Sequence, residues 1–153
     1  MSAPLILEEN EMKDFNGEIQ YKDRTLKLVF NLNVMEKVQE EYGDVDTWGE
    51  LTDGRAYARK AYEAQEHEVS WDDLTDEQRA QFKGEPDAKA VIFGFTEMLN
   101  EGLDIECEEN GTEFKPFTLK QVGRIITEVG LAKATETMNK TVIESAKSTE
   151  KNA

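Results

Sequence analysis

Apolar and polar residues alternate along two short segments near the start of the chain. This period of two is typical of half-buried strands, and it places on one face Ile19 and Tyr21 of the first segment and Leu26, Leu28 and Phe30 of the second. Asp23 and Arg24, between the two segments, form a plausible tight turn. The sequence therefore predicts a β-hairpin that begins near Gly17.

The period then changes to that of amphipathic helices. In a first helix the apolar residues run from Val34 to Tyr42, its N-cap is Asn31 or Asn33, and Gly43 ends it. Trp48 and Leu51 follow on a short turn that docks on the core. Further helices are expected at residues 55–68, 75–84, 87–102, 118–130 and 131–148, the third capped by Asp87 and the fourth by Thr118.

Residues 103–114 break this helical pattern. Gly102 is the natural stop of the helix before them, and Asn110-Gly111 is a hairpin turn signal. Because Ile105 and Cys107 alternate before that signal, the sequence permits a second short hairpin.

Together the patterns predict an α+β fold, mostly α-helical, with an N-terminal β-hairpin packed against a bundle of four to six helices. The length of the chain favours one domain, which we place at residues 17–148. It is preceded by a segment at 1–16, where residues 4–7 can form a short edge strand. It is followed by a flexible end at 149–153.

The charge of the chain limits its partners. It has 33 acidic and 18 basic residues, a formal net charge of −15, and residues 118–153 hold only four of the acids against six bases. Such acidity disfavours nucleic acid and anionic membranes and favours solubility and basic partners. No apolar run approaches the roughly 20 residues of a membrane span, residues 1–10 lack the features of a secretory signal, and a single cysteine fits a reducing cytosol.

The residue types of catalysis and metal binding are sparse. With one histidine, His67, and one cysteine, Cys107, neither a Ser-His-Asp set, a Cys-His set nor a usual zinc site is expected. Residues 44–55 begin like an EF-hand loop, but Trp48 and Arg55 occupy two of the ligand positions. We therefore expect no enzyme, no catalytic residue, no metal site and no cofactor.

The run Met35-Glu36-Lys37-Val38-Gln39-Glu40-Glu41-Tyr42-Gly43, after the predicted hairpin, resembles the N-terminal region of tail assembly chaperones of long-tailed, siphovirus-type bacteriophages. A second similarity lies in the apolar helix at residues 90–99, the acidic turn after it, and the run Phe117-Thr118-Leu119-Lys120-Gln121-Val122-Gly123-Arg124-Ile125-Ile126. The resemblance implies a small, non-catalytic α+β protein of viral morphogenesis.

The same resemblance implies a client. Such a chaperone binds the tape measure protein, a long helical chain with exposed apolar faces, and keeps it soluble in the host cell cytoplasm while tail tube protein polymerises around it. It is absent from the mature virion. Many members are also made as a longer product by ribosomal frameshifting, which can bind the short form. Here Glu150-Lys151-Asn152 can be encoded by codons that contain the slippery heptamer A-AAA-AAC.

Apolar helical faces are the expected contact surfaces for the client. The candidate partner-binding residues are Tyr57, Tyr62, Phe95, Met98, Leu119, Val122 and Ile126. The same faces must also supply the core, and the sequence alone does not separate the two uses.

Two other functions stay open at this point. The acidity of residues 1–117 is also typical of an inhibitor that mimics DNA, such as an anti-restriction protein, whose partner would be a basic DNA-binding protein. A minor structural protein of the tail is the other alternative, and it would need longer strands for subunit pairing.

Overall fold

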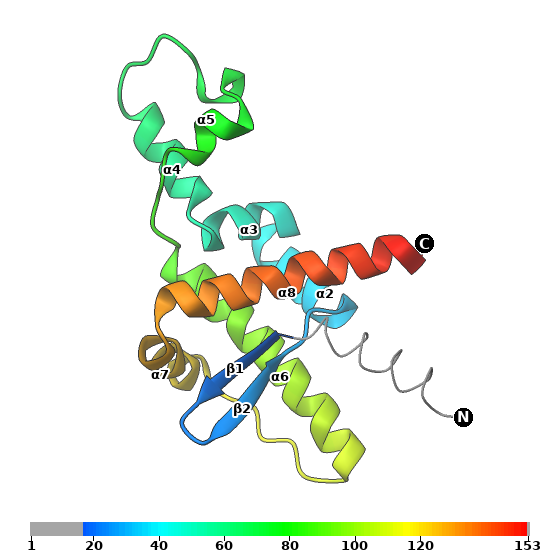
Figure 1. The fold of residues 1–153 in the computed structure, drawn as a ribbon. Coiled ribbons are helices and arrows are strands. Elements are labelled where there is room, and N and C mark those ends of the chain that lie inside the picture. The colour runs from blue at the N-terminus through cyan, green and yellow to red at the C-terminus, as the bar shows by residue number, and fades with distance from the viewer. Residues whose placement is uncertain (1–16, 153) are drawn as a thin grey trace, which may run out of the picture.

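The computed structural model describes residues 17–152 (Figure 1), so the expected edge strand at residues 4–7 lies outside the described part of the chain. A two-stranded hairpin is followed by seven α-helices, which confirms the expected α+β, mostly helical fold. The elements are β1 (Gly17–Tyr21), β2 (Arg24–Leu28), α2 (Leu32–Tyr42), α3 (Val45–Thr52), α4 (Arg55–Glu63), the 3-10 turn η1 (Trp71–Asp73), α5 (Asp76–Ala80), α6 (Ala88–Asn110), α7 (Leu119–Val129) and α8 (Leu131–Asn152).

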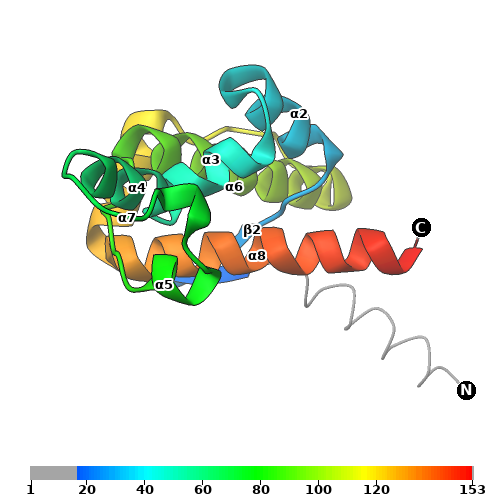
Figure 2. The ribbon, with the colours of Figure 1, turned by 90° about the horizontal axis from the view of Figure 1, so that it is seen from above.

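The hairpin is antiparallel, with Ile19 opposite Leu26 and Tyr21 opposite Arg24. Its turn is therefore Lys22-Asp23, one residue earlier than expected, and Lys22 adopts the left-handed conformation there with φ of 56°. The buried face of the strands meets the helices, because β2 packs on α6 and β1 on α8 (Figures 1 and 2). This arrangement makes the hairpin part of the core rather than a separate sheet.

The helix α6 is longer than the sequence pattern indicates. Gly102 does not end it, because this glycine lies where β2 crosses the helix, and a Cβ atom there would be 2.7 Å from the carbonyl oxygen of Lys27. The helix ends instead at Gly111, which has φ of 66° and whose N–H is bonded to the carbonyl of Cys107. The predicted second hairpin is therefore wrong: the Asn110-Gly111 signal, which favours positive φ, terminates a helix here.

Local capping signals agree with the structure at several helix starts. The side chains of Asn31, Asp87 and Thr118 accept hydrogen bonds from the expected backbone N–H groups, and Thr75 and Thr118 form capping boxes. One difference is the segment around Trp48, which is the full helix α3, capped by Asp44, rather than a short turn.

The main core is built around the contact between α3 and α6. The ring of Trp48 is fully buried, its Nε1 donates to the carbonyl oxygen of Ala90 at 3.0 Å, and Phe30 stacks on it with ring centroids 6.2 Å apart. Gly94 lets the ring approach the α6 backbone, since a Cβ atom at this position would lie 2.1 Å from the ring. The two helices are thus joined by both packing and a buried hydrogen bond.

This contact predicts the effect of adding one methyl group. Gly94→Ala should destabilise the fold by about 1–3 kcal/mol, because a buried indole has no free space into which to move. Gly49→Ala is the matched control in α3: nothing lies within 4 Å of its added Cβ, so it should be neutral or stabilise by about 0.5–1 kcal/mol through helix propensity. Urea denaturation of both variants checks this, and equal stabilities would contradict the packing described here.

Candidate partner-binding arm

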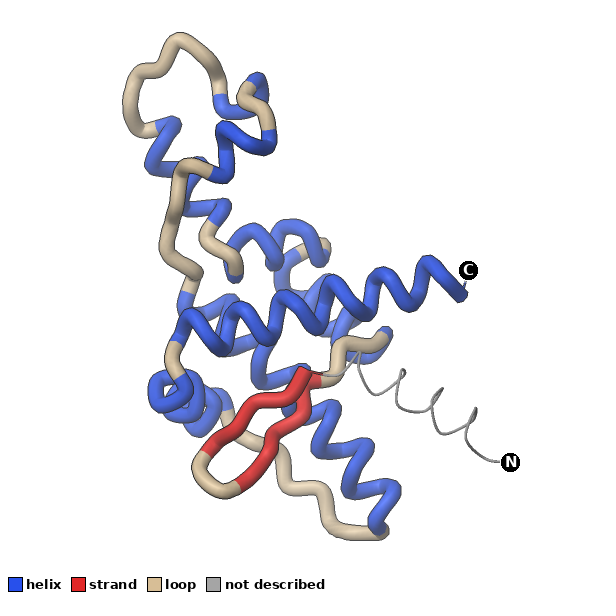
Figure 3. Tube along the Cα trace, in the orientation of Figure 1, coloured by secondary structure: helices blue, strands red, loops and turns tan. Residues whose placement is uncertain are grey.

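Residues 55–83 form an arm that extends away from the rest of the molecule and contains α4, η1 and α5 (Figures 1 and 3). The arm is attached at a neck formed by Gly54 and Gly84, whose backbones are in contact. A Cβ atom on Gly54 would lie 2.1 Å from the carbonyl oxygen of Gly84, and one on Gly84 would lie 2.4 Å from that of Gly54. The two ends of the arm therefore meet at one point, and both positions require glycine.

The arm has a small aromatic core of its own, centred on Tyr62. Trp71 and Phe82 contact the Tyr62 ring edge-on at centroid distances of 5.4 and 5.0 Å, and His67 stacks on it at 3.6 Å. The Tyr62 hydroxyl donates to the carbonyl oxygen of Val69 at 2.6 Å, which closes the loop between α4 and η1. Tyr62 and Trp71 belong to a hydrophobic cluster separate from the main core, so the arm is stabilised largely from within.

Part of this aromatic core faces outward. Phe82 is 41% exposed although its ring contacts both Tyr62 and Trp71, and Val69 is 45% exposed. Half-exposed aromatic rings on a projecting element are typical of protein-contact surfaces. The arm therefore offers an apolar surface that the fold itself does not use.

A groove of about 700 Å³ lies at the base of the arm; we call it the arm groove. Trp71 and Phe82 form its aromatic side. Four cationic and three acidic side chains line it, whereas the whole chain has 18 basic and 33 acidic residues. These charged residues are Arg55, Arg59, Arg79, Lys83, Glu50, Asp53 and Asp76.

Hydrogen bonds fix the arginines of the arm groove. Arg79 donates through Nε to the carbonyl oxygen of Trp71 at 3.0 Å and through Nη2 to that of Asp72 at 2.8 Å. Arg59 is bonded to Glu63 at 3.1 Å, and this bond, with the nearby charge of Asp72, raises the pKa of the guanidinium above its ordinary value. The arginines are thus ordered before any partner arrives.

Asp87 joins the arm to the body. Its Oδ1 accepts a hydrogen bond from the Tyr57 hydroxyl in α4, and its Oδ2 caps α6 by accepting from the N–H of Ala90 at 2.9 Å. The N–H of Asp87 donates to the carbonyl oxygen of Leu51 in α3 at 2.8 Å. The bonds that the carboxylate accepts from Tyr57 and, second, from Ala90 lower the pKa of the Asp87 carboxyl, and the contact with Asp87 raises the pKa of Tyr57.

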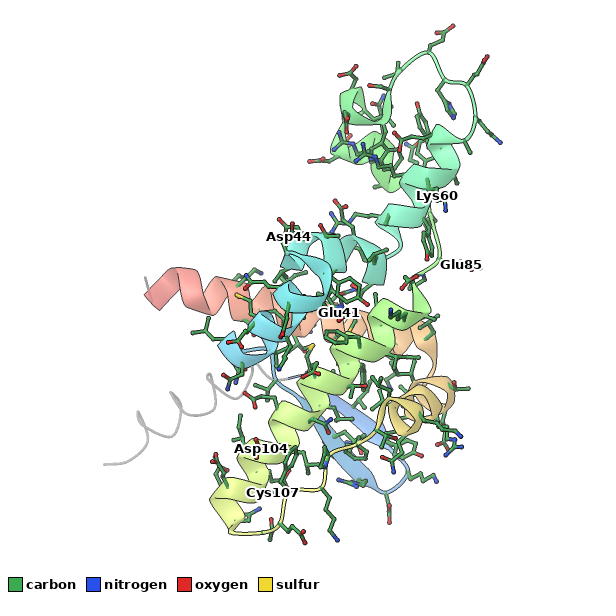
Figure 4. All side chains as sticks on the ribbon, turned by 180° about the vertical axis from the view of Figure 1, so that it is seen from behind. Glu41, Asp44, Lys60, Glu85, Asp104 and Cys107 are labelled. Carbon is green, nitrogen blue, oxygen red and sulfur yellow. The ribbon has the colours of Figure 1, made fainter. Side chains whose placement is uncertain are left out.

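A second groove, of about 450 Å³, lies between α2 and α6, and its lining includes the acids Glu97, Glu101 and Asp104. Glu101 accepts hydrogen bonds from the amides of Asn31 and Asn33 at 2.6 and 2.9 Å. Its carboxylate therefore attaches the start of α2 to α6. Figure 4 shows Lys60 on the arm at one end of the molecule and Asp104 and Cys107 of α6 at the other.

The candidate partner-binding residues divide into three groups. Four of them, Phe95, Met98, Val122 and Ile126, lie together in the main core with at most 5% exposure. Tyr62 lies in the core of the arm. Tyr57 and Leu119 remain on the surface, 38% and 57% exposed. The faces of α6 and α7 that the sequence offered as contact surfaces are thus occupied by the fold.

Sequence reasoning missed the arm groove. The available signal was the spacing of its cations: Arg55 and Arg59 are four residues apart and share a face of α4, and Arg79 and Lys83 have the same spacing. His67 is exposed, and its stacking on Tyr62 had no sequence signal.

Within residues 17–152, no group of three or more His, Cys, Asp or Glu side chains is arranged to hold a metal ion. None of the described helices combines the length and the apolar character needed to cross a membrane. Comparison with known proteins adds no family: no protein-family model, no curated protein and no solved structure matches this chain.

The Asp87 bridge predicts a pH dependence. Because the pKa of this carboxyl is lowered in the fold, its stabilising contribution is complete above the ordinary value of about 3.9 and is lost as the pH falls through the lowered folded value. Asp87→Asn keeps a capping oxygen but does not titrate, so its stability should fall less steeply below about pH 4. Tyr57→Phe, which removes one bond to the carboxylate, should give an intermediate slope.

Urea denaturation at a series of acidic pH values measures these slopes. If wild type and Asp87→Asn lose stability in parallel, the bridge between arm and body does not contribute as described.

Proposed function

We propose that this protein is a non-catalytic tail assembly chaperone that binds the tape measure protein through its arm and keeps that client soluble while the tail tube polymerises. The observation that carries the proposal is the projecting arm, whose aromatic core lies apart from the main core and leaves the Phe82 ring 41% exposed. The similarity of residues 35–43 and 117–126 to phage tail assembly chaperones supports it from the sequence.

The distribution of apolar surface suits such a function. The buried apolar residues of α6 and α7 belong to the main core, so we place the contact with the client elsewhere. The arm presents Phe82, Val69 and Tyr57 at its surface. Since a long helical client exposes many similar apolar sites, several chaperone copies bind along it, each through a small patch, and dissociate as tail tube protein replaces them.

The negative charge of the chain also supports a function in keeping a client soluble. A net charge of −15 opposes self-association of the chaperone and of the chaperone–client complex, because copies bound side by side repel one another and stay in solution. The proposal includes a location in the host cytoplasm, absence from the finished virion, and a longer frameshifted form.

Co-expression of the tagged protein with the tape measure protein of the same genome tests the proposal. Phe82→Ser removes an exposed ring of the arm and should lower the soluble, co-purifying client several-fold, because the apolar contact is lost. Leu119→Ser is the matched control: it removes a more exposed apolar side chain at the start of α7, outside the arm, and should retain the client. Circular dichroism of both variants verifies that they are folded.

Retention of the client by Phe82→Ser and its loss by Leu119→Ser would place the contact on α7 and contradict the arm as the binding element. Capture of a basic DNA-binding protein or a restriction subunit, in place of a long helical protein, would overturn the chaperone function and favour the DNA-mimic alternative.

A further inference from the structure

We infer that the arm groove selects a short acidic segment of the client, one in which carboxylates flank an aromatic or aliphatic side chain. This inference rests on the proposed function, because it names the part of the client that the arm recognises. The groove brings Arg55 and Arg59 of α4, Arg79 of α5, and Lys83, which lies beyond the end of α5, to the edge of the aromatic side formed by Trp71 and Phe82.

The charges of the groove cations are compensated to different degrees. Arg59 pairs with both Glu63 and Asp72, whereas Arg79 is compensated less. The two strongest bonds of Arg79 are to backbone carbonyl oxygens, which orient the guanidinium and leave its charge unchanged. Its ion pair with Asp76 is 3.5 Å long, and the Asp76 side chain is fully exposed, so this pair is weak. Further N–H groups of Arg79 remain for a carboxylate, which the planar guanidinium binds in a bidentate manner.

Lys83 adds a second available cation. It lines the groove and makes no ion pair with any described residue. Arg55 is bonded to Asp53 at 2.6 Å, and its side chain is 63% exposed, so an incoming carboxylate can share it. Arg55 of α4, Arg79 of α5 and Lys83, in the segment after α5, therefore line a space large enough for a few side chains.

The aromatic side of the groove offers a contact surface for the apolar side chain of the ligand. Phe82 and Trp71 contact each other edge-on at 6.0 Å, which leaves the exposed face of Phe82 toward the groove and the solvent. An aromatic or aliphatic side chain placed there gains burial, while the flanking carboxylates reach Arg79 and Lys83.

The acidity of the rest of the chain restricts the ligand to a short segment. At about 0.1 M salt, charges more than ~10 Å apart are screened, so a segment confined to the groove is attracted by the local cations. A long polyacid extends over the surrounding negative surface and is repelled. A basic segment is attracted by that surface generally, but the cations of the groove exclude it from this site.

Fluorescence anisotropy with the full-length protein tests the inference. The probe is a short labelled peptide with two carboxylates around one phenylalanine, and the comparison peptides have lysine in place of the carboxylates or are poly-glutamate. We expect the first peptide alone to saturate. Lys83→Glu should weaken its binding about ten-fold, because one attractive charge becomes repulsive.

Lys60→Glu is the matched control, since it makes the same charge change on the arm at an exposed lysine outside the groove. It should leave the affinity within about two-fold of wild type. Equal weakening by both variants would mean that only overall charge matters and would overturn the inference. Saturation by the lysine peptide or by poly-glutamate at similar concentrations would overturn it as well.

Comparing peptide binding with co-purification of the tape measure protein distinguishes failure of the groove inference from failure of the chaperone proposal. If the acidic peptide does not bind while the tape measure protein still co-purifies, the groove inference fails and the chaperone function stands. If the peptide binds with the expected pattern but the tape measure protein does not, the chaperone function fails and the groove remains selective for acidic segments. A concentration-dependent dimer that is lost in Lys83→Glu would identify a second copy of this acidic chain as the occupant and overturn the client assignment.

Discussion

The burial of Trp48 against α6 is the contact on which the rest of the structure depends. Gly94 allows the indole ring to reach the backbone of α6, and the bond from Nε1 to Ala90 fixes the register of α3 along it. The end of α3 is thereby held beside the start of α6, where the N–H of Asp87 meets the carbonyl of Leu51. Because the arm leaves after α3 and returns before α6, this one contact also brings the two glycines of the neck together.

The same arrangement explains how apolar surface is divided in this protein. The long helix α6 is packed by the hairpin, α2, α3 and α7 along its length, so its apolar residues are used for stability. The arm receives little of this core and builds its own around Tyr62. A small element with few apolar contacts leaves rings partly exposed, and a surface of that kind is available to a partner without unfolding the body.

Local signals predicted the hairpin, α2 and the starts of α6 and α7, because strand alternation and capping by Asn31, Asp87 and Thr118 depend on near neighbours in the chain. The course of α6 beyond Gly102 was not predictable in this way. At Gly102 the glycine is needed because a strand distant in sequence packs against the helix. Asn110-Gly111 fits the end of a helix as well as it fits a hairpin turn.

The candidate site was predicted in part. Tyr57 and Tyr62 do lie on the arm, but the pattern that marked Phe95 and Val122 as apolar could not say whether a client or the fold covers them. The pairs of arginine and lysine spaced by four were visible in the sequence. Their convergence was not, because it follows from the tertiary contact at the neck.

Hydrogen exchange of the protein, free and mixed with the tape measure protein that we propose as its client, tests most directly the claim that the arm is the client-binding element. The account predicts that slowed exchange on binding is concentrated in residues 55–83, while α6 and α7 exchange as they do in the free protein. Slowed exchange in α7 and α8, with the arm unchanged, would contradict it.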